Sequence, residues 1–449
     1  MKGRSVKPLL SRGEVDMVCD CMTENKEGEN KVERALLVGA YVELSTRDEA
    51  ASLLEELEEL VATLDVPVID RMLVHHREYH PRLLIGTGKA DEIIARAKSQ
   101  RCDVIIFDNE LSPSQQRNWE SLAGLTVIDR QEVILDIFAK RARTREARLQ
   151  VELAQMEYQM PRLTRGWTHL VRQGGGIGTR GEGETQLEQD KRRIRGSIDR
   201  CKRELESVRE SRATQRKDRK RTPVPNAAIV GYTNSGKSSL LHRLTGADVL
   251  IEDKLFATLD TTTRKIALPN KQPLLLTDTV GFVRKLPHRL VEAFNATLEE
   301  SVMADFLIHL LDASQPEVLE FYQTTRKVLA ELGADEKRTL IVFNKIDKVT
   351  EESTLAVHRR NFPGALFISV RTGEGLDELI ARMGEMADEG SMSCRLSVPQ
   401  SEGALLATIH RLGRILQTEY VGENVELVVI LPARLAETCE MYVVKDGEK

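Results

Sequence analysis

The middle of the chain reads Gly231-Tyr232-Thr233-Asn234-Ser235-Gly236-Lys237-Ser238, and this stretch decides the fold of the residues around it. Its spacing is G-x-x-x-x-G-K-[ST], a glycine-rich turn whose backbone N–H groups surround phosphate oxygens where a helix begins. An apolar run over residues 227–230 precedes the turn, and Ser239-Leu240-Leu241 follows it as a helix start. Strand, loop and helix together predict a phosphate-binding loop; a glycine turn that matches by chance is the alternative.

Two positions of this loop are candidates for direct chemistry. We expect Lys237 to reach the β- and γ-phosphates and the Ser238 hydroxyl to bind Mg²⁺. A second motif, Asp278-Thr279-Val280-Gly281, follows the strand-like residues 274–277. Asp278 would hold Mg²⁺ through water, and the N–H of Gly281 would sense the γ-phosphate. The candidate catalytic residues are Lys237, Gly281 and Asn234.

A threonine-rich segment lies between these two motifs and begins Phe256-Ala257-Thr258-Leu259-Asp260. One of its hydroxyl groups should complete the Mg²⁺ shell when a triphosphate is bound. Spacing alone does not choose between Thr258, Thr261 and Thr262, because threonine is also common in strands and turns.

The base is read further along the chain, by Asn344-Lys345-Ile346-Asp347 after the strand-like run 339–343. A carboxylate at Asp347 accepts hydrogen bonds from the N1–H and 2-amino groups of guanine, and adenine lacks that pair of donors. Ser369-Val370-Arg371 suits a last loop whose N–H groups touch the guanine O6. Motifs in this order predict a GTP-binding domain over residues 223–388. We expect the residues named above in each motif to hold the nucleotide.

Position 282 sets an expectation about catalysis. Many GTPases carry a glutamine after the glycine of the second motif, where it orients the attacking water. This chain has Phe282, which forms no hydrogen bond to water. We therefore expect slow intrinsic hydrolysis, or a water placed by something else. Asn234 offers one route, because in some GTPases that this chain resembles an asparagine at that loop position helps to bind K⁺; the alternative is that it only shapes the loop.

Composition narrows the class of protein. A chain of 449 residues is long enough for several domains, and 41% hydrophobic residues allow real cores. No apolar run approaches membrane-spanning length, and no secretory signal opens the chain. The six cysteines form no C-x-x-C pair, which fits a reducing cytosol. His75, His76 and His80 could bind metal, but a polar loop suits them better.

The first part of the chain predicts two regions. Residues 1–32 are charged and predict a mobile tail, whereas residues 33–140 alternate strand and helix patterns typical of a small α/β domain. Within this domain, Gly86-Thr87-Gly88-Lys89 is too short for a nucleotide loop. It predicts a tight turn, with ATP use or a contact to an RNA backbone as the alternative.

Local patterns also predict helix boundaries. Thr46-Arg47-Asp48-Glu49 matches a capping box for a helix over residues 46–64, and Ser112-Pro113 matches another helix start. Near the C-terminus, residues 391–393 are typical of a linker, and residues 403–417 predict a helix before a strand over 426–431. Residues 389–449 therefore predict a small α/β appendage.

Residues 141–222 predict a basic helical hairpin. Positions 141–221 hold 22 Lys and Arg against 12 Asp and Glu, a net charge of +10 in a chain whose total is −5. Residues 184–217 predict its second long helix. Such a concentration of positive charge indicates a polyanionic partner for this region. One helical stripe of the first arm is formed by Leu149, Leu153, Met156 and Met160.

The turn between the two arms, residues 173–186, has six glycines within ten residues and leaves the backbone open to close approach. Guanidinium groups flank it. This combination suits folded RNA, which is read largely by shape and phosphates; a flexible tether is the alternative. The candidates for RNA contact are Arg165, Arg172, Gly175, Gly176, Gly178 and Arg180.

Four stretches together resemble the HflX family, in the Obg–HflX group of translation-factor-related GTPases: residues 111–118, 127–130, 174–188 and 231–238. The resemblance covers about residues 33–388 and implies that Thr258 is the metal-binding threonine. It also implies binding to the large ribosomal subunit, where members of the family split stalled or idle ribosomes and the glycine-rich tip reaches toward the peptidyl-transferase region. Glu182 and Thr261 depart from the family, which commonly has proline at both positions; these changes can loosen a turn without removing a ligand.

The sequence thus predicts a multidomain α/β protein, in which a P-loop GTPase domain follows a small α/β domain and a helical hairpin. We expect a cytoplasmic, Mg²⁺-dependent GTPase, with K⁺ as a further candidate ion and GTP and GDP as ligands. We expect it to bind the large ribosomal subunit and its RNA, to insert into no membrane and to be monomeric when free. Its expected role is the splitting or rescue of ribosomes. The alternatives are a role in large-subunit assembly, and a non-ribosomal regulatory GTPase whose hairpin binds protein.

Overall fold

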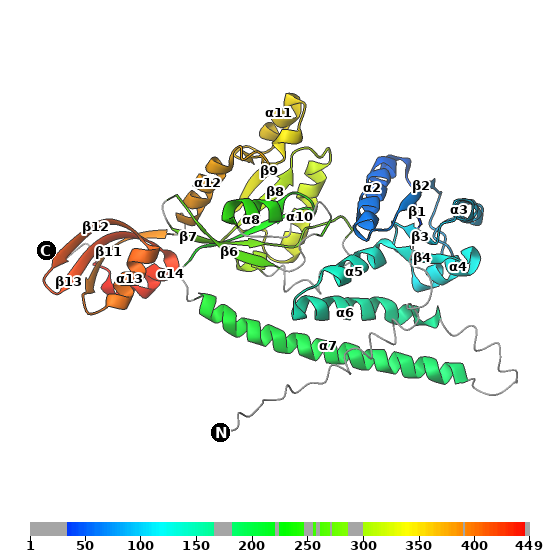
Figure 1. Ribbon diagram of the computed structural model, residues 1–449, viewed down its shortest axis with the longest axis horizontal. Coiled ribbons are helices and arrows are strands. Elements are labelled where there is room, and N and C mark those ends of the chain that lie inside the picture. The colour runs from blue at the N-terminus through cyan, green and yellow to red at the C-terminus, as the bar shows by residue number, and fades with distance from the viewer. Residues whose placement is uncertain are drawn as a thin grey trace, which may run out of the picture. The chain divides into compact units, whose positions relative to one another are not determined.

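The computed structural model describes residues 34–165, 182–220, 224–246, 255–256, 261–269, 272–285, 300–388 and 391–444 (Figure 1). The chain divides into two compact units, Met1–Arg130 and Gln131–Lys449. Both units combine sheets with helices, which confirms the predicted α/β fold class.

The first unit contains a four-stranded parallel sheet in the order β2-β1-β3-β4. Its strands are β1 (Ala35–Tyr41), β2 (Val68–His75), β3 (Val104–Phe107) and β4 (Thr126–Asp129). Its helical segments are η1 (Leu44–Thr46), α2 (Arg47–Thr63), α3 (Thr87–Ser99) and α4 (Pro113–Ala123). Every residue of β1 and β3 is buried, as expected of a parallel sheet whose faces both carry helices.

The two predicted helix starts of this unit have different outcomes. Ser112 caps α4 as predicted: its hydroxyl accepts from Gln115 N–H, and the Gln115 side chain accepts from Ser112 N–H. The capping box at Thr46 is wrong. The Thr46 hydroxyl donates instead to the carbonyl of Glu43 at 2.8 Å, because a 3-10 turn precedes α2 and points this side chain away from the helix.

A single face of α4 holds the loop between β2 and α3. Gln115 Nε2 donates to the carbonyl of His80 at 3.4 Å, and Asn118 Nδ2 donates to that of Arg82 at 3.0 Å. Trp119, which is fully buried, donates from Nε1 to a third carbonyl in the same loop at 2.8 Å. Side chains three and four positions apart share a helix face, so this helix binds the loop along its length.

The second unit opens with helices that include the predicted hairpin arms. They are α5 (Arg130–Arg141), α6 (Arg145–Gln159), η2 (Met160–Arg165) and α7 (Glu182–Lys220). The apolar stripe predicted on the first arm packs against α7, where Ile194, Ile198 and Cys201 belong to the same cluster. Outside this cluster, Lys202 Nζ lies 2.8 Å from Glu157 Oε1. The seam between the arms is therefore apolar inside and charged outside.

A six-stranded sheet in the order β10-β9-β8-β5-β7-β6 forms the centre of the second unit. All neighbours are parallel except β6, which is antiparallel to β7. The strands are β5 (Asn226–Gly231), β6 (Thr262–Ala267), β7 (Pro273–Asp278), β8 (Phe306–Asp312), β9 (Thr339–Asn344) and β10 (Leu366–Phe367). The helical segments are α8 (Lys237–Thr245), α10 (Val318–Glu331), η3 (Ile346–Lys348), α11 (Glu352–Asn361) and α12 (Leu376–Asp388).

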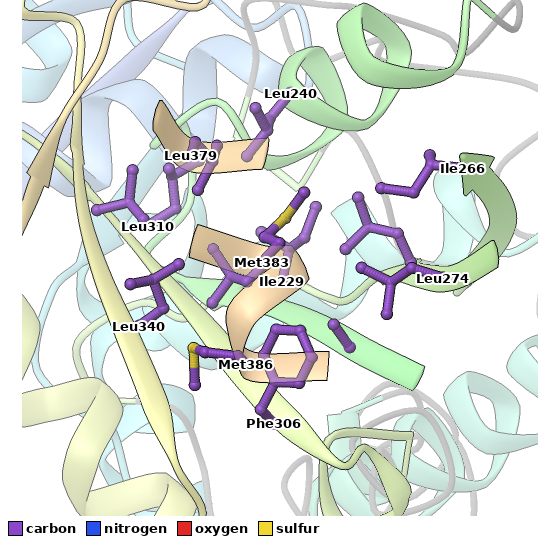
Figure 2. Close-up of a cluster of buried hydrophobic side chains, with 14 of the residues drawn as sticks. Ile229, Leu240, Ile266, Leu274, Phe306, Leu310, Leu340, Leu379, Met383 and Met386 are labelled. Carbon is purple, nitrogen blue, oxygen red and sulfur yellow. The ribbon is translucent and has the colours of Figure 1, made fainter. Parts of the chain in front are cut away.

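The core of this sheet lies beneath α8 and α12. Figure 2 shows Met383 and Met386 of α12 among apolar side chains of the central strands, including Ile229 and Leu310. These strands are almost fully buried, and burying a residue of this size stabilises the fold by roughly 1.5–3 kcal/mol. The rigid sheet fixes the places from which its connecting loops start.

The C-terminal residues form an antiparallel sheet in the order β11-β13-β12, which corrects two predictions. Residues 391–393 are the start of a strand and not a linker, because they pair with β13. The helix predicted to reach residue 417 ends at Leu412, and Ile415 pairs with Val429. The elements are β11 (Ser391–Pro399), α13 (Gly403–Leu412), β12 (Arg414–Val421), β13 (Asn424–Pro432), α14 (Ala433–Thr438) and η4 (Glu440–Tyr442).

None of the helices among the described residues is both long and apolar enough to cross a membrane. The long helix α7 carries charged residues along its length.

Candidate functional site

The glycine-rich motif joins β5 to α8 at the carboxyl edge of the central sheet, as its spacing predicts. Two of its glycines are required by geometry. Gly231 has a φ of +151°, and a Cβ there would lie 2.2 Å from the carbonyl oxygen of Leu310. Gly236 has a φ of +96°, and a Cβ there would lie 2.4 Å from Asn344 Nδ2. The loop is therefore packed tightly against two neighbouring strands.

Lys237 lies inside this loop and is almost fully buried. Its Nζ donates to the carbonyl of Gly231 at 3.1 Å and to that of Tyr232 at 2.7 Å. Burial lowers the pKa of the Lys237 ammonium to about 8, although the negative charge of Asp278 acts in the opposite direction. The side chain is thus still mainly a cation at neutral pH, held where the motif expects a phosphate contact.

The two residues expected to bind metal are in direct contact. Ser238 Oγ donates to Asp278 Oδ2 at 2.7 Å, which joins the start of α8 to the end of β7. A hydroxyl and a carboxylate are hard oxygen ligands of the type that Mg²⁺ prefers. The donor set therefore fits this ion.

The segment after β7 runs along the phosphate loop. Phe282 N–H donates to the carbonyl of Gly231 at 3.1 Å, and Thr233 N–H donates to the carbonyl of Phe282 at 2.8 Å. The Phe282 ring is buried. Gly281 lies beside Lys237, and this placement depends on the missing side chain: a Cβ there would come within 2.9 Å of Lys237 Nζ.

The N-K-x-D motif follows β9 and begins at the same edge of the sheet. Asn344, which is buried, donates from Nδ2 to the carbonyl of Ser235 at 2.9 Å. Its Oδ1 accepts from Val370 N–H at 3.1 Å. One side chain thus braces the phosphate loop and the loop after β10, the role expected of this asparagine.

Asp347 is held by that same last loop. Ser369 Oγ donates to Asp347 Oδ1 at 2.6 Å, and Arg371 Nε lies 3.2 Å from Oδ2. The Asp347 carboxylate therefore has a fixed direction, and the Arg371 side chain beside it is largely exposed.

Asp312 was missed by the sequence reasoning and also belongs to the site. It ends β8, and its Oδ2 lies 2.8 Å from Lys345 Nζ. The same ammonium is 3.4 Å from Asn234 Oδ1. The available signal was a carboxylate that directly follows the strand-like residues 306–311, which are apolar apart from His309, because such carboxylates emerge at the loop edge of a parallel sheet.

Other predicted residues lie elsewhere in the second unit or outside the described ranges. Phe256 is buried, and its ring lies 4.6 Å from that of Phe138. Arg165 lies in η2. Outside the described residues lie Ala257, Thr258, Leu259, Asp260, Arg172, Gly175, Gly176, Gly178 and Arg180.

The three clustered histidines lie in the first unit, where His75 ends β2 and His76 and His80 lie in the loop that follows. His75 Nε2 bonds to the carbonyl of Val42 at 3.1 Å, and His76 Nδ1 bonds to that of Glu78 at 2.8 Å. The ring nitrogen Nδ1 of His80 accepts from Arg82 N–H at 3.2 Å. These bonds to the main chain give the histidines a structural role within the loop.

Known proteins match nearly the whole chain. The family described as GTP-binding GTPase N-terminal matches residues 51–139, and the GTP-binding GTPase middle region matches residues 141–219. A family described as 50S ribosome-binding GTPase matches residues 226–345. A GTPase HflX of Akkermansia muciniphila is 50% identical over 94% of this chain and 99% of its own length. The GTPase HflX of Escherichia coli is 42% identical over 89% of this chain and 94% of its own length.

The chain belongs to the HflX family of GTPases. It is accordingly an enzyme that hydrolyses GTP, with a P-loop domain for that reaction. A crystal structure of a GTP-binding protein from Sulfolobus solfataricus in complex with GDP is 25% identical, covers 80% of this chain and 99% of its own, and has a TM-score of 0.41.

Proposed function

We propose that this HflX-type enzyme binds GTP at the loop edge of its central sheet with the residues of the five sequence elements described above. The observation that carries the proposal is a set of three contacts around the glycine-rich loop: Lys237 Nζ donates to the Tyr232 carbonyl, and Ser238 Oγ donates to Asp278. In the third contact, Asn344 Nδ2 donates to the Ser235 carbonyl. Phosphate, metal and base chemistry thus meet along one edge, as in other doubly wound folds. Lys237 would hold the β- and γ-phosphates.

Ser238 and Thr258 would be ligands of Mg²⁺, and Asp278 would hold the ion through water. The ion would neutralise charge on the β- and γ-phosphates. The Lys237 ammonium group would also neutralise phosphate charge, because Lys237 remains mainly protonated at neutral pH. Gly281 would donate its N–H to the γ-phosphate. If K⁺ binds beside Asn234, the amide oxygen of Asn234 has to release the Lys345 ammonium group and bind the ion instead.

Guanine would be read by Asp347, whose carboxylate is already directed by Ser369. The N1–H and 2-amino groups of guanine each donate to one carboxylate oxygen, and a base without them leaves a desolvated carboxylate unpaired. Ser369, Val370 and Arg371 would line the O6 side.

We further propose that the large ribosomal subunit is the partner and that the enzyme splits or rescues stalled or idle ribosomes in the cytoplasm. The description of the matching family as 50S ribosome-binding supports the partner, and the +10 charge of residues 141–221 supports contact with RNA. Phe282 cannot orient water, so contact with the subunit would supply that step. Hydrolysis would then release the γ-phosphate contacts and the protein.

GTP hydrolysis with and without large subunits, in K⁺ and in Na⁺, tests this proposal. Strong stimulation by subunits is the expected result, and a rate indifferent to subunits favours the non-ribosomal regulatory GTPase. Faster hydrolysis in K⁺ than in Na⁺ supports the ion beside Asn234. Sedimentation of intact ribosomes with protein and GTP separates the other two roles: free subunits support splitting, whereas intact ribosomes favour a role in subunit assembly.

A further inference from the structure

The phosphate loop is joined to the segment after β7 by a short parallel bridge. Tyr232 pairs with Phe282 in this bridge, through the two backbone hydrogen bonds that Phe282 makes with Gly231 and Thr233. These bonds extend the sheet by one step beyond the ends of β5 and β7. The segment is therefore part of the sheet edge in this conformation.

A side chain adds a third bond to this bridge. Arg284 N–H donates to the hydroxyl oxygen of Tyr232 at 2.7 Å, and both residues are buried. The Tyr232 ring is stacked on Phe321 of α10, with 4.1 Å between ring centroids and 14° between planes. The Arg284 guanidinium lies over the same Phe321 ring at 5.4 Å and 3.6 Å from Glu320. Tyr232 thus fastens the segment to a helix as well as to the loop.

In this conformation, no space separates Gly281 from the loop. A methyl group at Gly281 would already lie 2.9 Å from Lys237 Nζ and 2.8 Å from Thr233 Cγ2. A γ-phosphate bound both by the lysine ammonium and by the glycine N–H has to lie between them. The segment must therefore move outward when the terminal phosphate enters, whereas a diphosphate makes no such demand.

We propose that Tyr232 is a positioning residue whose hydroxyl holds the segment Phe282–Arg284 against the phosphate loop and so favours GDP over GTP. The inference rests on the proposed phosphate contacts of Lys237 and Gly281. A ligand shifts an equilibrium between two conformations only through its different affinities for them. Each hydrogen bond that stabilises the closed segment therefore lowers the affinity for GTP relative to the affinity for GDP. The Tyr232 hydroxyl supplies one such bond in addition to those of the backbone.

Tyr232→Phe tests this inference, because it removes the hydroxyl and keeps the ring on Phe321. Affinities for GDP and for a non-hydrolysable GTP analogue are measured on the full chain by competition with a fluorescent nucleotide. The preference for GDP over the analogue should fall by roughly tenfold, the size expected for one buried hydrogen bond. Hydrogen exchange of the peptide that contains Arg284 should accelerate. Tyr420→Phe is the matched control, because Tyr420 is an exposed tyrosine of β12.

A second variant, Phe321→Leu, removes the stacking partner and leaves the hydroxyl in place. This variant should also lower the preference for GDP over the analogue. It tests the inference on its own if Tyr232→Phe does not fold. An unchanged preference in the folded variants overturns the inference, as does equal weakening of both nucleotides, which is the mark of a structural role. If the unaltered protein binds neither nucleotide, the proposed GTP site fails instead, so the two failures are distinguishable.

Discussion

Asn344 Nδ2 donates to the carbonyl oxygen of Ser235 across 2.9 Å, and this bond fastens the base-reading motif to the phosphate loop. The two residues are 109 positions apart in the chain. The other end of the same amide accepts from Val370 N–H. One buried side chain therefore links the N-K-x-D motif to the glycine-rich loop and to the loop after β10.

Replacing this amide should affect every nucleotide alike. Asn344→Ala leaves the Ser235 carbonyl and the Val370 N–H buried without this partner, at a cost of about 1–3 kcal/mol per group. We expect a lower thermal midpoint and weaker binding of GDP and GTP, by at least about tenfold for each. Asn424→Ala is the control, because its amide bonds to Ser397 in the C-terminal sheet. Normal affinity in Asn344→Ala contradicts the bracing role.

Asp347→Asn should instead change which base is accepted. An amide replaces one carboxylate oxygen by a donor, which faces the donors of guanine and repels them. GTP affinity should fall by at least about a hundredfold, and the preference for GTP over inosine triphosphate, which lacks the 2-amino group, should disappear. Asp335→Asn, in an exposed turn, is the matched control. Retained discrimination between the two triphosphates would show that another group reads the base.

Nucleotide binding should weaken in mild alkali. The pKa of Lys237 is lowered to about 8, mainly by burial, so its ammonium deprotonates as the pH rises through that value. The cationic form binds phosphate, and the affinity for GDP should therefore decline above pH 8 by up to about tenfold per pH unit. Binding curves between pH 7 and 9 measure this decline. Lys237→Arg stays charged over the whole range and should give a flat profile, even if its affinity is lower.

Stability of the GTPase domain should fall in mild acid because of His309 on β8. This side chain is fully buried and stacked on Tyr322, and burial, together with the positive charges of Arg326 and Lys237, lowers its pKa to about 3. The unfolded chain takes up a proton below pH 6.5, whereas the folded chain does so only near pH 3. The unfolded state therefore binds more protons in this window, and stability decreases as the pH falls.

The effect should reach roughly 2 kcal/mol at pH 5. His309→Leu removes the titrating ring at similar volume, and the thermal midpoint of this variant should change less between pH 7 and 5 than that of the unaltered protein. His410→Leu, at an exposed position of α13, controls for the loss of a histidine. An equally acid-sensitive His309→Leu protein would assign the effect to other groups.

The parts of this structure that were predictable from sequence are those in which chemistry dictates spacing along the chain. The phosphate loop is one, because its glycines allow backbone positions that Gly231 and Gly236 adopt. The capped start of α4 at Ser112 is another, since cap and partner are three residues apart. In both cases the residues that carry the signal lie within a few positions of one another.

Contacts between distant residues were not predictable in the same way. The ion pair between Asp312 and Lys345 forms only when β8 and β9 lie side by side. No pattern within either segment predicts this contact. The sequence predicts that the preceding helix continues to residue 417, whereas residues 414–417 begin β12. Pairing with β13 decides the outcome, and Gly413 allows the close approach of that strand: a Cβ there would lie 2.6 Å from Leu431 Cδ2.

Arg130 also makes contacts with residues far away in the sequence, and its replacement tests what stabilises the first unit. Its guanidinium donates to Glu56 Oε1 at 2.5 Å and to Asp108 Oδ1 at 2.8 Å, and it reaches the carbonyl of Leu53 at 3.3 Å. All three charged side chains are buried. A buried cation between two carboxylates adds little by comparison with apolar packing, but its removal leaves uncompensated charge.

Arg130→Met should therefore destabilise the first unit by about 3–5 kcal/mol. Hydrogen exchange of peptides from β1 and β3, measured in the full chain, should accelerate accordingly. Converting the partners as well, with Glu56→Gln and Asp108→Asn in the same protein, removes the unpaired charge and should restore most of the protection. Arg47→Leu, on the exposed side of α2, controls for the loss of an arginine. If Arg130→Met exchanges no faster than this control, the buried ions do not stabilise the sheet, and its stability comes from the apolar contacts of β1 and β3 alone.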